Sequence, residues 1–170
     1  MNGNSFIDEF KSQSIHQMEL NLPRIKKCFN MLSEEEIWKR PNESSNSIGN
    51  LILHLCGNIH QYVISSLGNR PDIRERDLEF ATQGGYQKDE LFIKLTETVE
   101  EALGIILDVP EDELLRKRTV QGFNHSGIGI VIHVTEHFSY HTGQIAFWTK
   151  LLKDKDLGFY SALDLNKKNE

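Results

Sequence analysis

The sequence predicts an all-α protein, a four-helix bundle with a short extended fragment before the last helix. Four segments have apolar residues three or four positions apart, which is helical spacing. Breakers and polar runs separate the segments, and strand signals are almost absent. The segments are residues 5–32, 48–67, 89–107 and 126–152. Amphipathic helices of about 20 residues bury their apolar faces against one another as a bundle.

Length and charge limit the classes of function. The chain has 170 residues and a formal net charge of −6. We therefore expect residues 1–170 to form one bundle domain, with a loose tail from about residue 154. A chain of this length folds without a metal, so a metal would serve function. The acidic balance argues against a nucleic-acid partner, because phosphates are normally bound by a basic face.

The sequence also predicts the cellular compartment of the protein. Its first residues have no basic segment followed by an apolar one. The densest apolar stretch, residues 128–134, is far shorter than the roughly 20 residues that span a bilayer. We expect a cytoplasmic protein with no membrane partner. Cys28 and Cys56 show no CxxC spacing, and we expect both to be reduced thiols.

In the first half of the chain, local signals mark the ends of the helices. Pro23 lies inside the first segment and should bend it, because proline has no N–H to donate. Ser33 precedes three glutamates in a capping box that opens a short turn. Residues 40–46 are a loop by composition. Ser47 is the expected N-cap of the second helix, which ends at Gly68.

Two polar connections follow. Residues 69–88 exceed the usual loop length, which indicates a functional segment or a short helix near residues 74–77. A short turn at residues 111–115 leads to the extended fragment, residues 118–123. Residues 69–85 and 121–125 are candidates for the rim of a cavity, with solvated loops as the alternative.

Chemistry is concentrated on the last helix, which carries His133, His137 and His141. A helical wheel places His141 in the middle of the apolar arc, His137 at its edge and His133 farthest out. Side chains four residues apart are about 6 Å apart at Cβ, so both inner imidazoles can reach one ion. The alternative is a pair of hydrogen-bonded core histidines. We expect His133 at a solvated edge or supporting the ligands.

The second helix offers a third ligand. His54 borders its buried arc, whereas His60 should face solvent. Asn58, one turn after His54, is placed to support the site, to contact substrate or simply to pack between helices. Three neutral imidazoles without a thiolate suit zinc or another late first-row ion, with positions left for water. An open position indicates catalysis.

A competing pattern covers part of the same helix. His133-Val134-Thr135-Glu136-His137 matches H-x-x-E-H, the inverted zinc-protease signature. That chemistry would use Glu136 as a general base. On the wheel, Glu136 points away from His141 toward solvent, and only 33 residues follow His137. We therefore favour the three-histidine site.

Two motifs together resemble the DinB/YfiT-like superfamily of small bacterial four-helix-bundle proteins. They are Leu53–Asn58 on the second helix and the H-x-x-x-H-x-G-Q run from His137 to Gln144 on the fourth. Residues 76–80 and 120–123 also look like segments of one uncharacterised branch.

The resemblance implies a divalent metal, zinc or nickel, bound by His54, His137 and His141, and a homodimer. Phe6, Phe10 and Phe29 could supply the dimer stripe. Asn58, His133 and Gln144 are grouped as residues that support the ligands or contact substrate.

Characterised members of the superfamily include maleylpyruvate isomerase and transferases that use bacillithiol, mycothiol or glutathione. We therefore expect a metal-dependent enzyme that activates a thiol or water for attack on a small electrophile. A thiol S-transferase in detoxification or stress fits this description, and a low-molecular-weight thiol is then the partner. The alternative is a non-catalytic dimeric metal-binding module.

Overall fold

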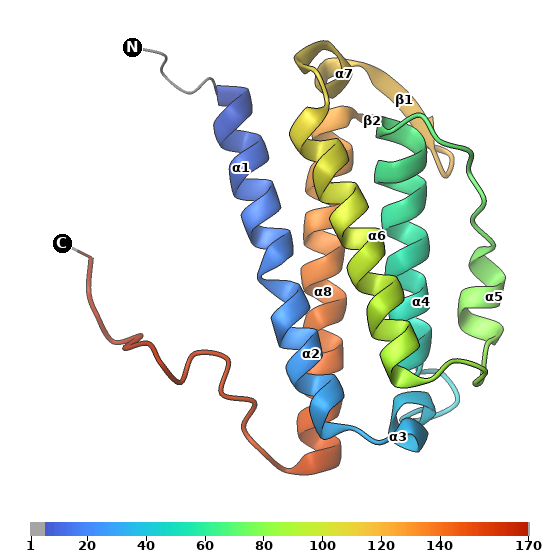
Figure 1. The fold of residues 1–170 in the computed structure, drawn as a ribbon, viewed down its shortest axis with the longest axis vertical. Helices are drawn as coiled ribbons and strands as arrows, with labels where there is room; N and C mark the ends of the chain where they lie inside the picture. Colours follow the sequence, from blue (N-terminus) through green and yellow to red (C-terminus); the bar gives the residue numbers. More distant parts are fainter. Residues whose placement is uncertain (1–5, 170) are drawn as a thin grey trace.

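A computed structural model describes residues 6–169 and shows a mostly helical protein with a small two-stranded sheet (Figure 1). The helices are α1 (Phe6–Glu19), α2 (Asn21–Met31), α3 (Glu34–Trp38), α4 (Ile48–Ile59), α5 (Arg76–Ala81), α6 (Lys88–Asp108), α7 (Glu111–Leu115) and α8 (Gly127–Lys153), with the π-helix η1 (His60–Leu67) after α4. Strands β1 (Lys117–Val120) and β2 (Phe123–Ser126) form an antiparallel hairpin. The expected extended fragment is therefore a complete hairpin.

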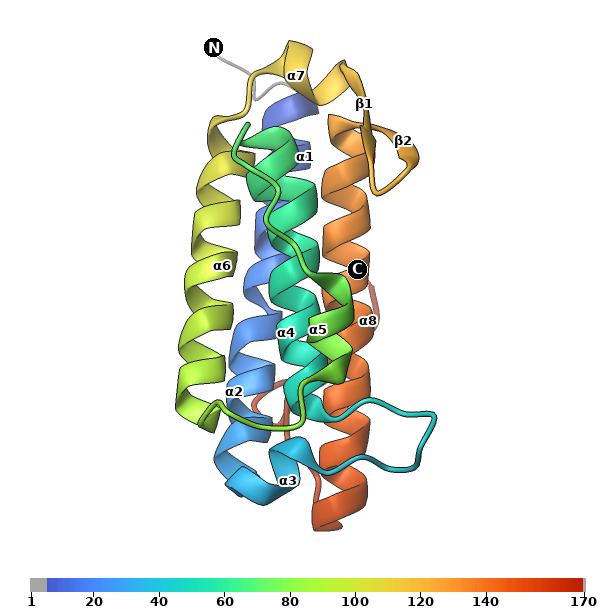
Figure 2. The same cartoon turned by 90° about the vertical axis from the view of Figure 1, so that its right-hand side faces the viewer.

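The long helices run side by side around one apolar core (Figures 1 and 2). α4 packs against α6 and α8, and α2 packs against α8. Side chains at helical spacing fill the interior, as the sequence predicts. The largest fully buried ones include Tyr62, Phe29, Phe138, Met18 and Ile25. The short helix α5 lies across the outer face of α4 (Figure 2).

The first predicted helix is two helices. α1 ends at Glu19 and α2 begins at Asn21, with a turn at Leu20. Pro23 has no N–H to donate to the carbonyl of Glu19, four residues earlier, so the break comes one turn before the proline. Ser5, the expected start, lies outside the described residues.

The second predicted helix changes its winding at His60. In η1 the backbone bonds span five residues, for example from the N–H of Gly68 to the carbonyl of Val63, at 2.9 Å. Such segments are rare and are often found at functional sites. The α-helical wheel does not hold after His60, whose own N–H still bonds the carbonyl of Cys56. The expectation that His60 faces solvent is wrong for another reason, because it lines a cavity together with Ile73 and Arg74 of the following connection. His60 is half-buried, and its Nδ1 is buried without a hydrogen-bond partner.

Side-chain caps fix the start of α4 and tie the next segment to it. Ser47 forms a capping box with Asn50, as Ser33 does at α3. The Asn50 amide also donates to the carbonyls of Glu79, at 2.9 Å, and Thr82, at 2.7 Å. α5, expected near residues 74–77, occupies residues 76–81 and is therefore held against the N-terminal half of α4.

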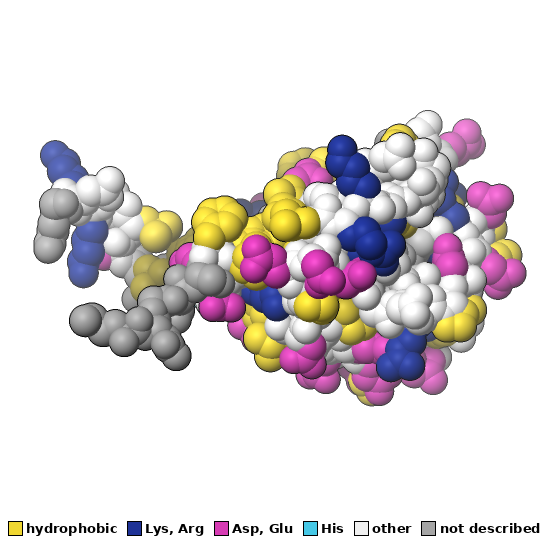
Figure 3. All heavy atoms as spheres, turned by 90° about the horizontal axis from the view of Figure 1, so that it is seen from above, with side chains coloured by type: hydrophobic (Ala, Val, Ile, Leu, Met, Phe, Trp, Pro, Cys, Tyr) yellow, Lys and Arg dark blue, Asp and Glu magenta, His cyan; other side chains and the backbone are white. Residues whose placement is uncertain are grey.

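The chain after α8 has neither helix nor strand. Leu157 is nevertheless buried, and Lys27 donates to the carbonyl of Gly158 at 3.1 Å. Acidic, basic and apolar side chains are interspersed on the end of the molecule that carries α7 (Figure 3). Within residues 6–169, no helix is both long enough and apolar enough to cross a membrane.

Candidate metal centre

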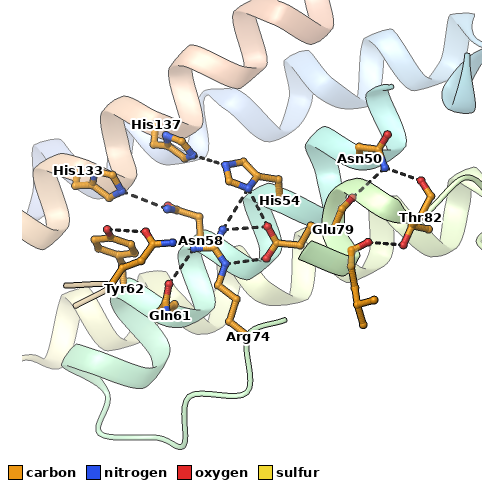
Figure 4. A network of polar contacts seen from close by, with 12 residues as sticks. Asn50, His54, Asn58, Gln61, Tyr62, Arg74, Glu79, Thr82, His133 and His137 are labelled. Atoms are coloured by element: carbon orange, nitrogen blue, oxygen red, sulfur yellow. Dashed lines mark hydrogen bonds and ion pairs between the residues drawn. The ribbon is translucent and has the colours of Figure 1, made fainter. Parts of the chain in front are cut away.

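Three histidines from two facing helices converge beside the core. His54 lies on α4, and His137 and His141 lie one turn apart on α8. One ring nitrogen from each lies within 4.8 Å of the other two. The Nε2 atoms of His54 and His137 are 2.9 Å apart, and Figure 4 shows these rings pointing toward each other. The ring centroids of His137 and His141 are 4.4 Å apart.

A buried carboxylate fixes the protonation of His54. Nδ1 of His54 lies 2.8 Å from Oε2 of Glu79. Burial alone raises the pKa of Glu79, but hydrogen bonds from His54 and Arg74 outweigh it and hold the pKa below its ordinary value. An ionised carboxylate can only accept, so Nδ1 of His54 carries the proton. In the neutral form of the ring, the form that binds metal, Nε2 of His54 then presents its lone pair to the cluster.

Arg74 holds that carboxylate in place. Its Nε donates to Oε1 of Glu79 at 2.7 Å, and Nη2 donates to Oε2 at 3.0 Å. The side chains of Arg74 and Glu79 are only 2% and 8% exposed. Arg74 Nη1 also donates to Gln61 at 2.9 Å (Figure 4). Gln61 in turn donates to Asp72 at 2.8 Å. The buried pair is therefore fully hydrogen-bonded, the condition under which a buried ion pair is tolerated.

Gly57 leaves room for this pair. A Cβ at residue 57 would collide with Oε1 of Glu79 and lie 3.1 Å from Nε of Arg74. Any larger residue would push the carboxylate away from α4. Gly57 in the Leu53–Asn58 motif therefore leaves the space in which the carboxylate of Glu79 can bind His54.

His141 is oriented by a different partner. Its Nδ1 lies 2.6 Å from Oε1 of Gln144, a carbonyl oxygen that only accepts, so Nδ1 carries the proton and Nε2 is free. Burial lowers the pKa of His141 to about 4. Burial, together with the neighbouring imidazoles, lowers the pKa of His137 to about 3. Both rings are therefore neutral at neutral pH, the form that binds metal.

These residues fit a divalent cation. In the His54–His137 contact, two ring nitrogens face each other at 2.9 Å, which requires a proton or a cation between them. Two nitrogens that share one zinc ion, each at about 2.1 Å, would be separated by a little over 3 Å. Three neutral imidazoles suit zinc or a neighbouring first-row ion.

The other predicted site residues lie next to the cluster. His133 stacks on Tyr62, with ring centroids 4.2 Å apart, and its Nε2 contacts the Asn58 amide at 3.2 Å. Burial lowers the pKa of His133. Oδ1 of Asn58 is buried without a partner. His133 is outside the group of three and Glu136 is exposed, so the geometry does not favour an inverted-protease site.

The two predicted rim segments lie near different parts of the site. Residues 73–75 and part of α5 line a cavity of about 270 Å³ between α4 and α6. In the second segment, Gln121 accepts a hydrogen bond from the hydroxyl of Tyr62 at 3.1 Å. The roles of both segments as a rim stay predictions.

Sequence reasoning missed Glu79, Arg74 and Gln61 as parts of the site. For Glu79 and Arg74 the signals were the unusual length of the polar connection and the segments marked within it, whereas Gln61 lies in η1 and had no signal. Glu79 is 25 residues from His54 along the chain, and no local spacing reveals such a contact.

Comparisons with known proteins support the fold. The family model described as "Protein of unknown function (DUF1572)" matches residues 5–166. Among curated proteins, no sequence matches significantly. A DinB-like protein of Bacillus subtilis, YjoA, superposes with a TM-score of 0.66 at 17% identity, covering 87% of this chain and 96% of its own. A conserved protein of Enterococcus faecalis superposes with a TM-score of 0.70 at 13% identity, covering 85% of this chain and 97% of its own. The predicted resemblance is confirmed at the level of the fold: the chain has the DinB-like fold and belongs to the DUF1572 family.

Proposed function

We propose that this protein is a metal-dependent enzyme that activates a thiol or a water molecule for attack on a small electrophile. The observation that carries the proposal is the convergence of three imidazoles, two of them with Nδ1 already committed to a hydrogen bond. Three protein ligands leave a position open at an ion that takes four or more, the pattern of catalytic zinc sites. Zinc or nickel is the proposed ion.

The chain's own residues would prepare the site. Glu79 keeps the proton of His54 on Nδ1, and Gln144 does the same for His141. The ring of Phe80 lies 4.9 Å from that of His54, centroid to centroid, and would help to keep the ligands dry. A bound divalent ion lowers the pKa of a coordinated thiol or water and so supplies a nucleophile at neutral pH.

The alternative is a dimeric metal-binding module without catalysis. It would require the ion to be closed off by a fourth protein ligand, as structural zinc sites are. The described cluster contains three such residues, which favours the enzyme.

Thiol activation can be tested with a model reaction. We would follow the conjugation of a low-molecular-weight thiol to a chromogenic electrophile from pH 6 to 9, with zinc-loaded wild type and His141→Ala. Wild type should show an apparent pKa well below the free-thiol value of about 8.5. Identical profiles and rates in both proteins would exclude thiol activation and leave water activation or the binding module.

We further propose a cytoplasmic homodimer whose subunit is a four-helix bundle, with α1 and α2 counted as one broken helix. Phe29 does not belong to a dimer stripe, because it is 2% exposed and packs on Phe92 in the core. A groove between α1–α2 and α8, lined by Phe10 and Ile132, is the better candidate. A monomeric mass in light scattering at tens of micromolar with metal bound would reject the dimer.

A further inference from the structure

A groove lies next to the metal centre, between the loop that precedes α4 and the outer face of α8. Figure 2 shows this loop reaching toward the lower part of α8. The volume of the groove is about 650 Å³, within the range of about 300–1,000 Å³ typical of small-molecule sites. Its lining residues are Pro41, Asn42, Ser44, Ser45, Asn46, Leu51, Tyr140, Gly143, Gln144, Phe147, Trp148 and Leu151.

The groove lies beside the metal site: none of the three histidines lines it, but its lining residues on both helices are their neighbours. Gln144 lines the groove and also accepts the hydrogen bond from His141. The ring of Tyr140 lies 5.1 Å from that of His141, centroid to centroid. On α4, Leu51 lies one turn before His54. A molecule whose reactive group reaches the three imidazoles would therefore have its remaining atoms beside these side chains.

The lining has a distinct chemistry. None of the described residues around the groove carries a formal charge. Aromatic and aliphatic side chains come from α8, and hydroxyls and amides come from the loop. The exposed fractions of Phe147 and Leu151 are 68% and 64%, so apolar surface is available to a ligand. Arg40, the residue before Pro41, does not line the groove, and its guanidinium already donates to the carbonyl of Phe80 at 2.7 Å.

We propose that this groove binds the uncharged, flat apolar part of the substrate, and that the substrate class is a neutral molecule with an aromatic or similar ring next to its reactive group. The proposal rests on the metal-dependent function proposed above. A ring gains affinity by covering apolar surface and by offset contact with Tyr140 and Phe147. A carboxylate there would lose hydration without gaining a cation, so anionic substrates are disfavoured.

The test uses three hydroxamic acids, because a hydroxamate binds an open zinc position. Acetohydroxamic acid has no ring, benzohydroxamic acid adds a neutral ring, and 4-carboxybenzohydroxamic acid adds a charge. Binding to the zinc-loaded protein is measured by calorimetry. We expect benzohydroxamic acid to bind about tenfold more tightly than acetohydroxamic acid. The carboxylated probe should lose most of that gain.

Two exposed helix positions form a matched pair. Phe147→Ser removes groove surface on α8, whereas Ile93→Ser removes an apolar side chain on α6, 55% exposed, that does not line this groove. Phe147→Ser should reduce the advantage of benzohydroxamic acid to about twofold or less, with acetohydroxamic acid binding unchanged. Ile93→Ser should keep the full advantage. Circular dichroism and zinc content verify that both variants fold and retain metal.

The outcomes separate the two proposals. If no probe binds the zinc-loaded protein, the open metal site fails and the groove proposal fails with it. If acetohydroxamic acid binds but the ring adds no affinity, or Phe147→Ser keeps the ring's advantage, the groove proposal alone is overturned. Equal affinity of the charged and neutral ring probes would overturn the preference for an uncharged substrate. A change of mass in Phe147→Ser, with the ring's advantage intact, would assign the groove to a contact between subunits instead.

Discussion

His54 and His141 lie about 5 Å apart, yet the protein holds them in different ways. The ring of His54 is fixed by Glu79, a buried carboxylate that is itself locked by Arg74 and α5. The ring of His141 is fixed by the neutral amide of Gln144, an exposed side chain one turn away on the same helix. The first support requires the long connection to fold back on α4, and the second requires only α8. The support of His54 therefore depends on tertiary structure, and we expect it to contribute more to the metal affinity of the site than the support of His141.

The largest effect should come from removing a ligand. His54→Ala should lower zinc affinity by more than about a hundredfold, beyond what loss of an outer partner costs. His60→Ala, six residues later and outside the group of three, is the control and should keep wild-type affinity. Calorimetric titration of the metal-free proteins with zinc measures both. Equal zinc affinity in His54→Ala and wild type would refute the three-histidine assignment.

The second-largest effect should come from removing the buried carboxylate of Glu79. Glu79→Gln should weaken zinc binding by about 10–100-fold, because His54 exchanges a charged acceptor at Nδ1 for a weaker neutral amide that can also turn its NH2 toward the ring. It should also lower the melting temperature, since Arg74 is left buried without its counter-ion. Glu75→Gln changes the same charge at an exposed position and should do neither. Similar affinities in the two variants would show that Glu79 does not support the site.

A steric change should reproduce part of this loss without touching a polar group. Gly57→Ala should displace Glu79 and reduce both zinc affinity and stability, by about 1–3 kcal/mol for overpacking. Gly104→Ala, also on a helix but with open space at the added Cβ, should be neutral or stabilising. Thermal denaturation with and without zinc compares them. The steric account fails if the two variants behave alike.

The smallest effect on zinc binding should come from removing the side-chain amide of Gln144. Gln144→Ala should weaken zinc binding by about threefold to tenfold, the value of one ordinary hydrogen bond. Water can replace the exposed amide as acceptor for Nδ1 of His141. If Gln144→Ala loses as much zinc affinity as Glu79→Gln, then Gln144 and Glu79 support the site equally, and the difference proposed between them is refuted.

The sequence predicted the parts of this molecule that depend on local spacing. Helical periodicity located the long helices, and the i,i+4 relation of His137 and His141 brought their rings together. The same reasoning failed at His60, because a helical wheel does not show that the connection after η1 folds back and partly covers this residue. It also missed Arg74 and Glu79, whose roles arise only when the connection folds over α4.

The most direct test of the central claim is X-ray absorption at the zinc edge on the zinc-loaded protein. The account predicts three imidazole nitrogens at about 2.0–2.1 Å, one or more further light-atom ligands from solvent and no sulfur. In His54→Ala the imidazole contribution should fall to two, or the zinc signal should disappear after dialysis. A closed shell of four protein ligands, or a zinc–sulfur distance of about 2.3 Å, would contradict an open three-histidine centre.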